Sequence, residues 1–156
     1  MSVLGVSNKQ RIYKNFPLNT LGRNVHEVNK YKIFISKADG AAGQIGNPVP
    51  ARILGKSEIA ESGTACTETF LRIGPFDNKL QSVNAKTYIN TKFFRALVGS
   101  RKNKNMTSST YSFVPLQDFS KPWTDEELYK KYNLDKDEIE FIETMIKPMD
   151  VEVSDE

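Results

Sequence analysis

The chain has 156 residues, of which 38% are hydrophobic and 26% charged, and this length and composition suit one domain with a buried core. No apolar run approaches the roughly 18 residues of a membrane-spanning helix, and residues 1–6 do not resemble a secretory signal, so we expect no membrane partner and a cytoplasmic location. One cysteine, Cys66, and one histidine, His26, exclude an internal disulfide and a Cys/His zinc cluster.

Charge is distributed unevenly along the chain. Residues 1–104 contain 17 Lys and Arg against 6 Asp and Glu, a net charge of +11, whereas residues 105–156 contain 5 against 13, a net charge of −8. A basic body followed by an acidic end is typical of a protein that binds a polyanion. The alternative is that the two charges pair across the fold. The pattern favours a nucleic-acid partner.

Strands are predicted mainly in the first half of the chain. Residues 1–30 are polar and predict loops with at most one short strand. Residues 31–36 and 66–73 are rich in β-branched and aromatic side chains or end at glycine-bearing turns, so each predicts a strand. Shorter strands are expected at residues 52–54 and 111–114.

Two helices are predicted in the middle of the chain. Asp77 is a good N-cap for a helix over residues 78–90, and Thr91 for a second helix over residues 92–102. In the second helix we expect the apolar side chains to face inward and Arg95 to face outward.

The C-terminal part predicts a helical hairpin. Thr124 with Glu127 has the spacing of a capping box, and Asp135 with Glu138 has the same spacing at the start of a second helix. Between them, Asn133 is suited to the left-handed conformation that ends a helix.

These elements predict an α+β fold: a small mixed or antiparallel sheet packed by helices, with a C-terminal helical hairpin. We divide the chain into an irregular N-terminal segment at residues 1–30, a basic α+β body at residues 31–115, and an acidic helical hairpin and tail at residues 116–156.

No catalytic motif is complete. Gly55-Lys56-Ser57 matches the end of a phosphate-binding P-loop, but Pro50 stands where the first glycine is required. Asp77-Asn78-Lys79 has the acid-x-lysine pattern of a divalent-metal nuclease, although helix capping explains Asp77 better. We therefore assign no catalytic or metal-binding residue, and a divalent-metal-dependent nuclease domain stays open as an alternative.

Basic and amide side chains form the strongest candidate site. Lysines would contact DNA phosphates, whereas arginines and amides would contact base edges. The alternative is a merely solvated basic surface. The predicted DNA-binding residues are Lys37, Gln44, Arg52, Arg72, Lys92, Arg95, Arg101, Lys102, Lys104 and Asn105.

Three stretches resemble a known family. They are residues 61–77 (ESGTACTETFLRIGPFD), residues 91–95 (TKFFR) and residues 113–132 (FVPLQDFSKPWTDEELYKKY). They resemble the C-terminal region of bacterial restriction-modification proteins that carry adenine-specific DNA methyltransferases. The likeness runs from about Tyr31 to Met149, and its most specific block is residues 113–132. The family tends to have glycine where Asn133 stands.

The resemblance implies a DNA target-recognition module of a bacterial defence system. The partners it implies are duplex DNA and a methyltransferase domain or subunit, and the implied cofactor of that parent enzyme is S-adenosylmethionine. The glycine-rich donor site and the Asn-Pro-Pro-aromatic motif of such enzymes are absent from these 156 residues, so we expect no cofactor in this chain. The family often has glutamine at the position of Asn105. A protein-interaction module that docks a methyltransferase subunit is the remaining alternative.

Overall fold

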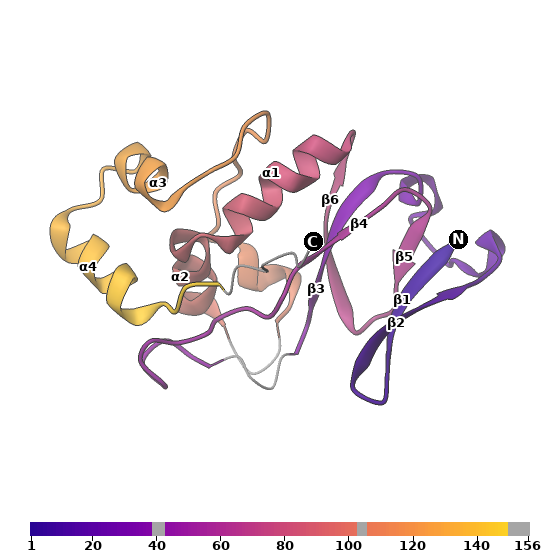
Figure 1. Ribbon diagram of the computed structural model, residues 1–156, viewed down its shortest axis with the longest axis horizontal. Coiled ribbons are helices and arrows are strands. Elements are labelled where there is room, and N and C mark those ends of the chain that lie inside the picture. The colour runs from indigo at the N-terminus through magenta and orange to yellow at the C-terminus, as the bar shows by residue number, and fades with distance from the viewer. Residues whose placement is uncertain (39–42, 103–105, 150–156) are drawn as a thin grey trace, which may run out of the picture.

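The computed structural model describes residues 1–38, 43–102 and 106–149. Within these ranges the chain forms three layers: an outer mixed sheet, an inner antiparallel sheet and a group of α-helices (Figure 1). The inner sheet lies between the outer sheet and the helices. The fold class is therefore α+β, as the sequence predicts, with two small sheets rather than one.

The outer sheet has the strand order β2-β1-β5. Antiparallel β1 (Ser2–Ser7) and β2 (Gln10–Asn15) form a hairpin, and the short β5 (Thr64–Cys66) runs parallel to β1. The prediction of loops with at most one short strand in the first 30 residues is therefore wrong. The hairpin turns at Asn8 and Lys9, whose φ angles of 51° and 64° match the primed turns that suit paired strands.

The inner sheet has the strand order β4-β3-β6. Its central strand, β3 (Tyr31–Ser36), confirms the prediction for residues 31–36, and β4 (Glu58–Ala60) and β6 (Phe70–Phe76) flank it. The strand predicted at residues 66–73 is instead divided between the two sheets. A turn, in which Phe70 N–H donates to the carbonyl of Thr67 at 3.1 Å, separates β5 from β6.

Alternation along β3 sends its side chains into two different environments. Ile33 and Ile35 belong to the main core, which the helices complete. Phe34 lies in a smaller core between the sheets with Leu4 and Phe70. The inner sheet is therefore covered on both faces, which explains why β3 is almost continuously buried.

Helices α1 (Lys79–Asn90) and α2 (Lys92–Arg101) confirm the two helices predicted in the middle of the chain. Thr91 caps α2 as predicted, with its hydroxyl accepting from Phe94 N–H at 3.1 Å. The N-cap of α1 is Asn78, whose side-chain oxygen accepts from Gln81 N–H at 2.9 Å. The capping role predicted for Asp77 is therefore wrong by one position.

Two predicted strands do not form. Near residues 52–54 the pairing is limited to one bridge between Ala51 and Ile146, and the apolar side chains of this segment are buried in the main core instead. Residues 108–111 form a 3-10 helix, η3 (Ser108–Tyr111), followed by a turn. Both segments contain β-forming residues, but neither pairs with a strand of the two sheets. Two further 3-10 helices are η1 (Leu18–Thr20) and η2 (Val25–Glu27).

The C-terminal helices α3 (Asp125–Lys131) and α4 (Lys136–Met145) begin with the two predicted capping boxes. Asn133 between them has φ of 51°, so the predicted left-handed helix end is confirmed. Both helices pack on α2 (Figure 1). No helix in the described ranges is long and apolar enough to span a membrane.

Candidate nucleic-acid interface

Half of the predicted contact residues lie around the C-terminal end of α2, a group that we call the α2-end cluster: Lys37, Gln44, Arg52, Arg101 and Lys102. Lys102 Nζ donates to the carbonyl of Gly43 at 2.9 Å, and Gly43 N–H donates to the carbonyl of Arg52 at 2.7 Å. Met106 N–H donates to the carbonyl of Lys37 at 3.0 Å. These bonds join the end of β3, the segment after residue 43 and the end of α2.

Close packing against α2 positions the segment that carries Gln44 and Arg52. A Cβ atom at Gly99 would lie 2.9 Å from the Ile45 side chain and 3.1 Å from that of Ile53, closer than side chains normally approach. Gly99 therefore allows Ile45 and Ile53 to lie directly on the helix, and these residues are the chain neighbours of the predicted contact residues Gln44 and Arg52.

Arg101 is held by an exposed aromatic ring. Its guanidinium carbon lies 4.4 Å from the centroid of the Phe113 ring, within the range of a cation–π interaction, and Phe113 is 54% exposed. Arg101 also stands in the last turn of α2, where a positive charge favours the helix dipole. The guanidinium is thus oriented by its own surroundings while it faces solvent.

Arg72 lies apart from the α2 end but shares a cavity with Lys37. The cavity has a volume of about 380 Å³ and lies between the two sheets, beneath the segment that contains η2. Arg72 forms an ion pair there with Glu27. Lys37 thus belongs to both the α2-end cluster and this cavity.

Arg95 does not belong to the interface, and the expectation that it faces outward is wrong. It is only 1% exposed, and its guanidinium donates to the carbonyls of Thr91 at 3.1 Å, Asn90 at 3.2 Å and Lys147. Burial lowers its pKa to about 10, although the charge of Asp125 acts in the opposite direction. Arg95 therefore joins α1, α2 and the chain after α4, because its planar fork reaches backbone carbonyls of all three.

Lys92, at the N-terminal end of α2, is also engaged by partners within the protein. Its ammonium forms an ion pair with Glu143 of α4, and its backbone N–H donates to the carboxylate of Asp125 at 3.0 Å. Asp125 also accepts from Phe93 N–H at 2.8 Å, so one acidic residue of α3 caps α2. Burial raises the pKa of Asp125, and these two hydrogen bonds oppose the rise. At this end of α2 the acids and bases pair across the fold.

The remaining two predicted contact residues, Lys104 and Asn105, lie outside the described residues.

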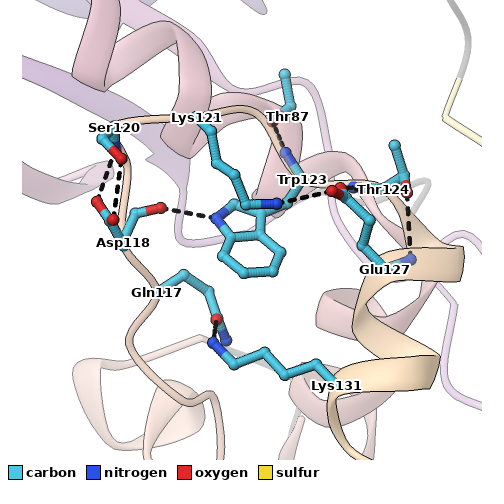
Figure 2. A network of polar contacts seen from close by, with 9 residues as sticks. All are labelled: Thr87, Gln117, Asp118, Ser120, Lys121, Trp123, Thr124, Glu127 and Lys131. Carbon is cyan, nitrogen blue, oxygen red and sulfur yellow. Dashed lines mark hydrogen bonds and ion pairs between the residues drawn. The ribbon is translucent and has the colours of Figure 1, made fainter.

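Trp123, in the block of residues 113–132, lies at the centre of a network of polar contacts (Figure 2). Its indole Nε1–H donates to the carbonyl of Asp118 at 2.8 Å, and its backbone N–H donates to the hydroxyl of Thr87 at 3.0 Å. The ammonium groups of Lys121 and Lys131 lie 3.9 Å and 4.6 Å from the centroid of the Trp123 ring. Trp123 therefore fastens the segment before α3 to α1 through its backbone N–H, while its ring orders that segment.

Gln117 extends this network. Its side-chain oxygen accepts from Lys131 Nζ at 2.7 Å, and its amide nitrogen donates to the hydroxyl of Tyr132 at 2.8 Å (Figure 2 shows the first contact). Lys121 also pairs with Glu127 at 2.7 Å. The polar groups of the block are thus engaged within the protein, which favours a role in building the fold.

The acid-x-lysine triplet does not form a metal site. Asp77 pairs with Lys30 at 2.7 Å, and Lys79 pairs with Glu61 at 2.6 Å, so the two side chains face different partners. Over the described part of the chain, no three His, Cys, Asp or Glu side chains gather in a way that could hold a metal ion.

Two basic residues outside the list of predicted contact residues, Arg23 and Lys32, also line the cavity. Lys32 alternates with Ile33 and Ile35 along β3, so strand periodicity could have placed it on the face away from the helices. Arg23 follows no periodic pattern, and no sequence signal points to it.

The chain was compared with family models, curated proteins and solved structures, and none of them matches it. Its function is therefore inferred from its residues and their geometry.

Proposed function

We propose that this chain is a duplex-DNA target-recognition module of a restriction-modification methyltransferase and is not catalytic by itself. The observation that supports the proposal is the separation of charge along α2. Hydrogen bonds to main-chain groups gather the four basic residues and the one amide residue of the α2-end cluster around the C-terminal end of the helix, whereas the acidic residues Asp125 and Glu143 engage its N-terminal end.

The exposed side chains of the cluster suit two kinds of contact. Arg101 and Gln44 are exposed and carry the donors and acceptors that read base edges. Lys37 is half-buried and offers an ammonium for a backbone phosphate. The methyltransferase domain or subunit would bind S-adenosylmethionine and carry out the reaction.

The acidic helices indicate how the DNA would be oriented. Glu126 of α3 and Glu140 of α4 are exposed carboxylates, which repel phosphate. The duplex would therefore lie across the C-terminal end of α2, with α3 and α4 directed away from it.

Fluorescence anisotropy of a labelled duplex tests the proposal. Affinity should fall steeply as salt rises, because bound phosphates release counterions. Replacing Lys37 and Arg101 together with glutamine should weaken binding and reduce the salt slope by about one unit for each lost phosphate contact. Lys14→Gln on β2 combined with Lys136→Gln on α4 is the matched control, with the same charge change at exposed positions, and should bind as the unmodified chain does.

Two outcomes would contradict the proposal. One is affinity that stays constant between low and high salt. The other is loss of binding in Glu126→Gln and Glu140→Gln variants while Lys37→Gln and Arg101→Gln bind normally.

Selection from a random duplex library should return a defined motif, whereas an unenriched pool would argue against target recognition.

The protein-docking alternative has one observation in its favour. Phe141 on α4 is 51% exposed, and Asp137 and Glu140 lie beside it on the same helix face. Binding of a methyltransferase subunit that is insensitive to salt, by a chain without DNA affinity, would favour this alternative.

A further inference from the structure

The cavity between the two sheets has a strongly basic lining. Its walls carry Arg23, Lys32, Lys37 and Arg72 against the carboxylates Glu27 and Glu68. Glu27 is neutralised by its ion pair with Arg72. Arg23 is exposed and Lys37 half-buried, so their charges are available to a molecule that enters the cavity.

Lys32 places a positive charge deep in the cavity. It is only 2% exposed, and its Nζ donates to the carbonyls of Glu27 at 3.1 Å, Val28 at 2.9 Å and Lys30 at 2.6 Å. Burial lowers the pKa of Lys32, but three carbonyl acceptors favour the protonated ammonium, because a neutral amine has only two hydrogens to donate. Carbonyl groups satisfy these hydrogens but carry no net charge, so the field of the ammonium persists in the cavity.

Cys66 does not offset this positive charge. It also lines the cavity, and burial raises its pKa to about 11, against the opposing effect of Lys32 and Lys37. The thiol is therefore neutral near pH 7 and adds no negative charge that would compete with an anion.

We propose that this cavity binds one phosphate group, supplied either by a DNA backbone or by a free nucleotide. Arg23 and Lys37 would contact the phosphate oxygens. Lys32, which is buried in the wall of the cavity, would stabilise the anion through its charge without direct contact. The volume of about 380 Å³ is sufficient for such a group and falls in the range of small-ligand sites. If the phosphate belongs to DNA, the inference rests on the proposed function and adds a second anchor to the α2-end cluster.

Cys66 provides a direct test because it is the only cysteine of the chain. The rate of its modification by N-ethylmaleimide, a neutral reagent, would be measured at mildly alkaline pH with and without ligand. The ligands are a duplex oligonucleotide, adenosine 5′-monophosphate, inorganic phosphate and adenosine, the last as the control without phosphate. At a ligand concentration ten times Kd, occupancy should slow the reaction about tenfold.

Matched variants identify the groups responsible. Replacing Arg23 and Lys37 together with glutamine should abolish protection, while replacing the exposed Lys14 and Lys136 together with glutamine, which makes the same charge change, should retain it. Circular dichroism would establish that each variant is folded. Protection that survives the double substitution would overturn the proposal, because it would not depend on the cations of the cavity.

The outcomes separate this inference from the proposed function. Protection by duplex but not by adenosine supports a backbone phosphate, and protection by the nucleotide or inorganic phosphate without duplex binding supports the cavity while refuting the DNA proposal. Duplex that binds by anisotropy without any ligand protecting Cys66 refutes the cavity and leaves the DNA proposal standing. Equal protection by adenosine and its monophosphate would show that phosphate is not recognised.

Discussion

The carboxylate of Asp125, the first residue of α3, accepts a hydrogen bond of 3.0 Å from the backbone N–H of Lys92, the first residue of α2. Together with its bond to Phe93 N–H, this contact satisfies two of the donors that a helix leaves unpaired at its start. A residue of the acidic C-terminal part thus completes a helix of the basic body.

Asp125→Ala should therefore destabilise the protein by about 1–3 kcal/mol, because it leaves two partly buried N–H groups without their charged acceptor. Urea unfolding measures the difference. The control is Glu126→Ala, which also removes an acid from the first turn of α3 but an exposed one, and should cost about 0.3–1 kcal/mol. Equal losses in the two variants would show that the capping bonds contribute little.

Arg95→Lys should also destabilise the fold, by about 1–3 kcal/mol, because a single ammonium cannot reproduce the guanidinium fork that reaches three carbonyls. Duplex affinity should not change under conditions in which the variant is folded, since Arg95 is buried. Arg101→Lys serves as the control and should leave the midpoint of thermal unfolding within a few degrees. A folded Arg95→Lys protein with weakened DNA binding would show that Arg95 takes part in the interface after all.

The ion pair of Lys92 with Glu143 should make stability depend on pH. Burial acts to raise the pKa of Glu143, but hydrogen bonds from Lys92 and Tyr129 outweigh it and lower the pKa below its usual value. A carboxyl whose pKa is lower in the folded state contributes stability above its unfolded pKa of about 4.3, and this contribution is lost as pH falls through the folded pKa.

Glu143→Gln should accordingly be less stable than the unmodified chain at pH 7, by under about 1 kcal/mol because the pair is partly exposed. The gap should close as the pH is lowered through the folded-state pKa of Glu143, which lies below the usual value of a glutamate. Thermal unfolding of both proteins across this range measures it. A gap that stays constant with pH would show that Glu143 acts through packing rather than through its charge.

Gly99→Ala should link stability to DNA binding. Its new methyl group would meet Ile45 and Ile53 at 2.9 Å and 3.1 Å, and this overpacking should cost about 1–3 kcal/mol. Because the displaced segment carries Gln44 and Arg52, duplex affinity should fall as well. Ser100→Ala, at an exposed position next in the helix, should change neither property. Unfolding and anisotropy measured on the same samples would separate the two effects.

The helices could be predicted because their signals are local. The caps at Thr91, Thr124 and Asp135 depend on residues three positions away, and all three form as the sequence indicates. The strands depended on partners far along the chain. Nothing near residues 52–54 shows that this apolar segment packs on α2, and the turn at Asn8 and Lys9 lacks the glycine that usually marks a hairpin.

The candidate site could be predicted only in part, for a related reason. Composition identified the basic residues, but whether each is free depends on which carboxylate or carbonyl the fold brings to it. Arg95 and Lys92 precede their partners Lys147 and Glu143 by about fifty residues. Arg101 ends a helix, where a local pattern already places it at the surface of the basic body.

Lys32 fixes the alignment of the central strand. Because neighbouring side chains on a strand point to opposite faces, a slip of β3 by one residue would carry Lys32 to the helix side and an isoleucine toward the outer sheet. The ammonium would then lose its three carbonyl acceptors and enter an apolar core, which costs several kcal/mol. The one charged residue of β3 thus excludes the shifted pairing, and the face that bears the cavity is decided as soon as β3 pairs with its neighbours.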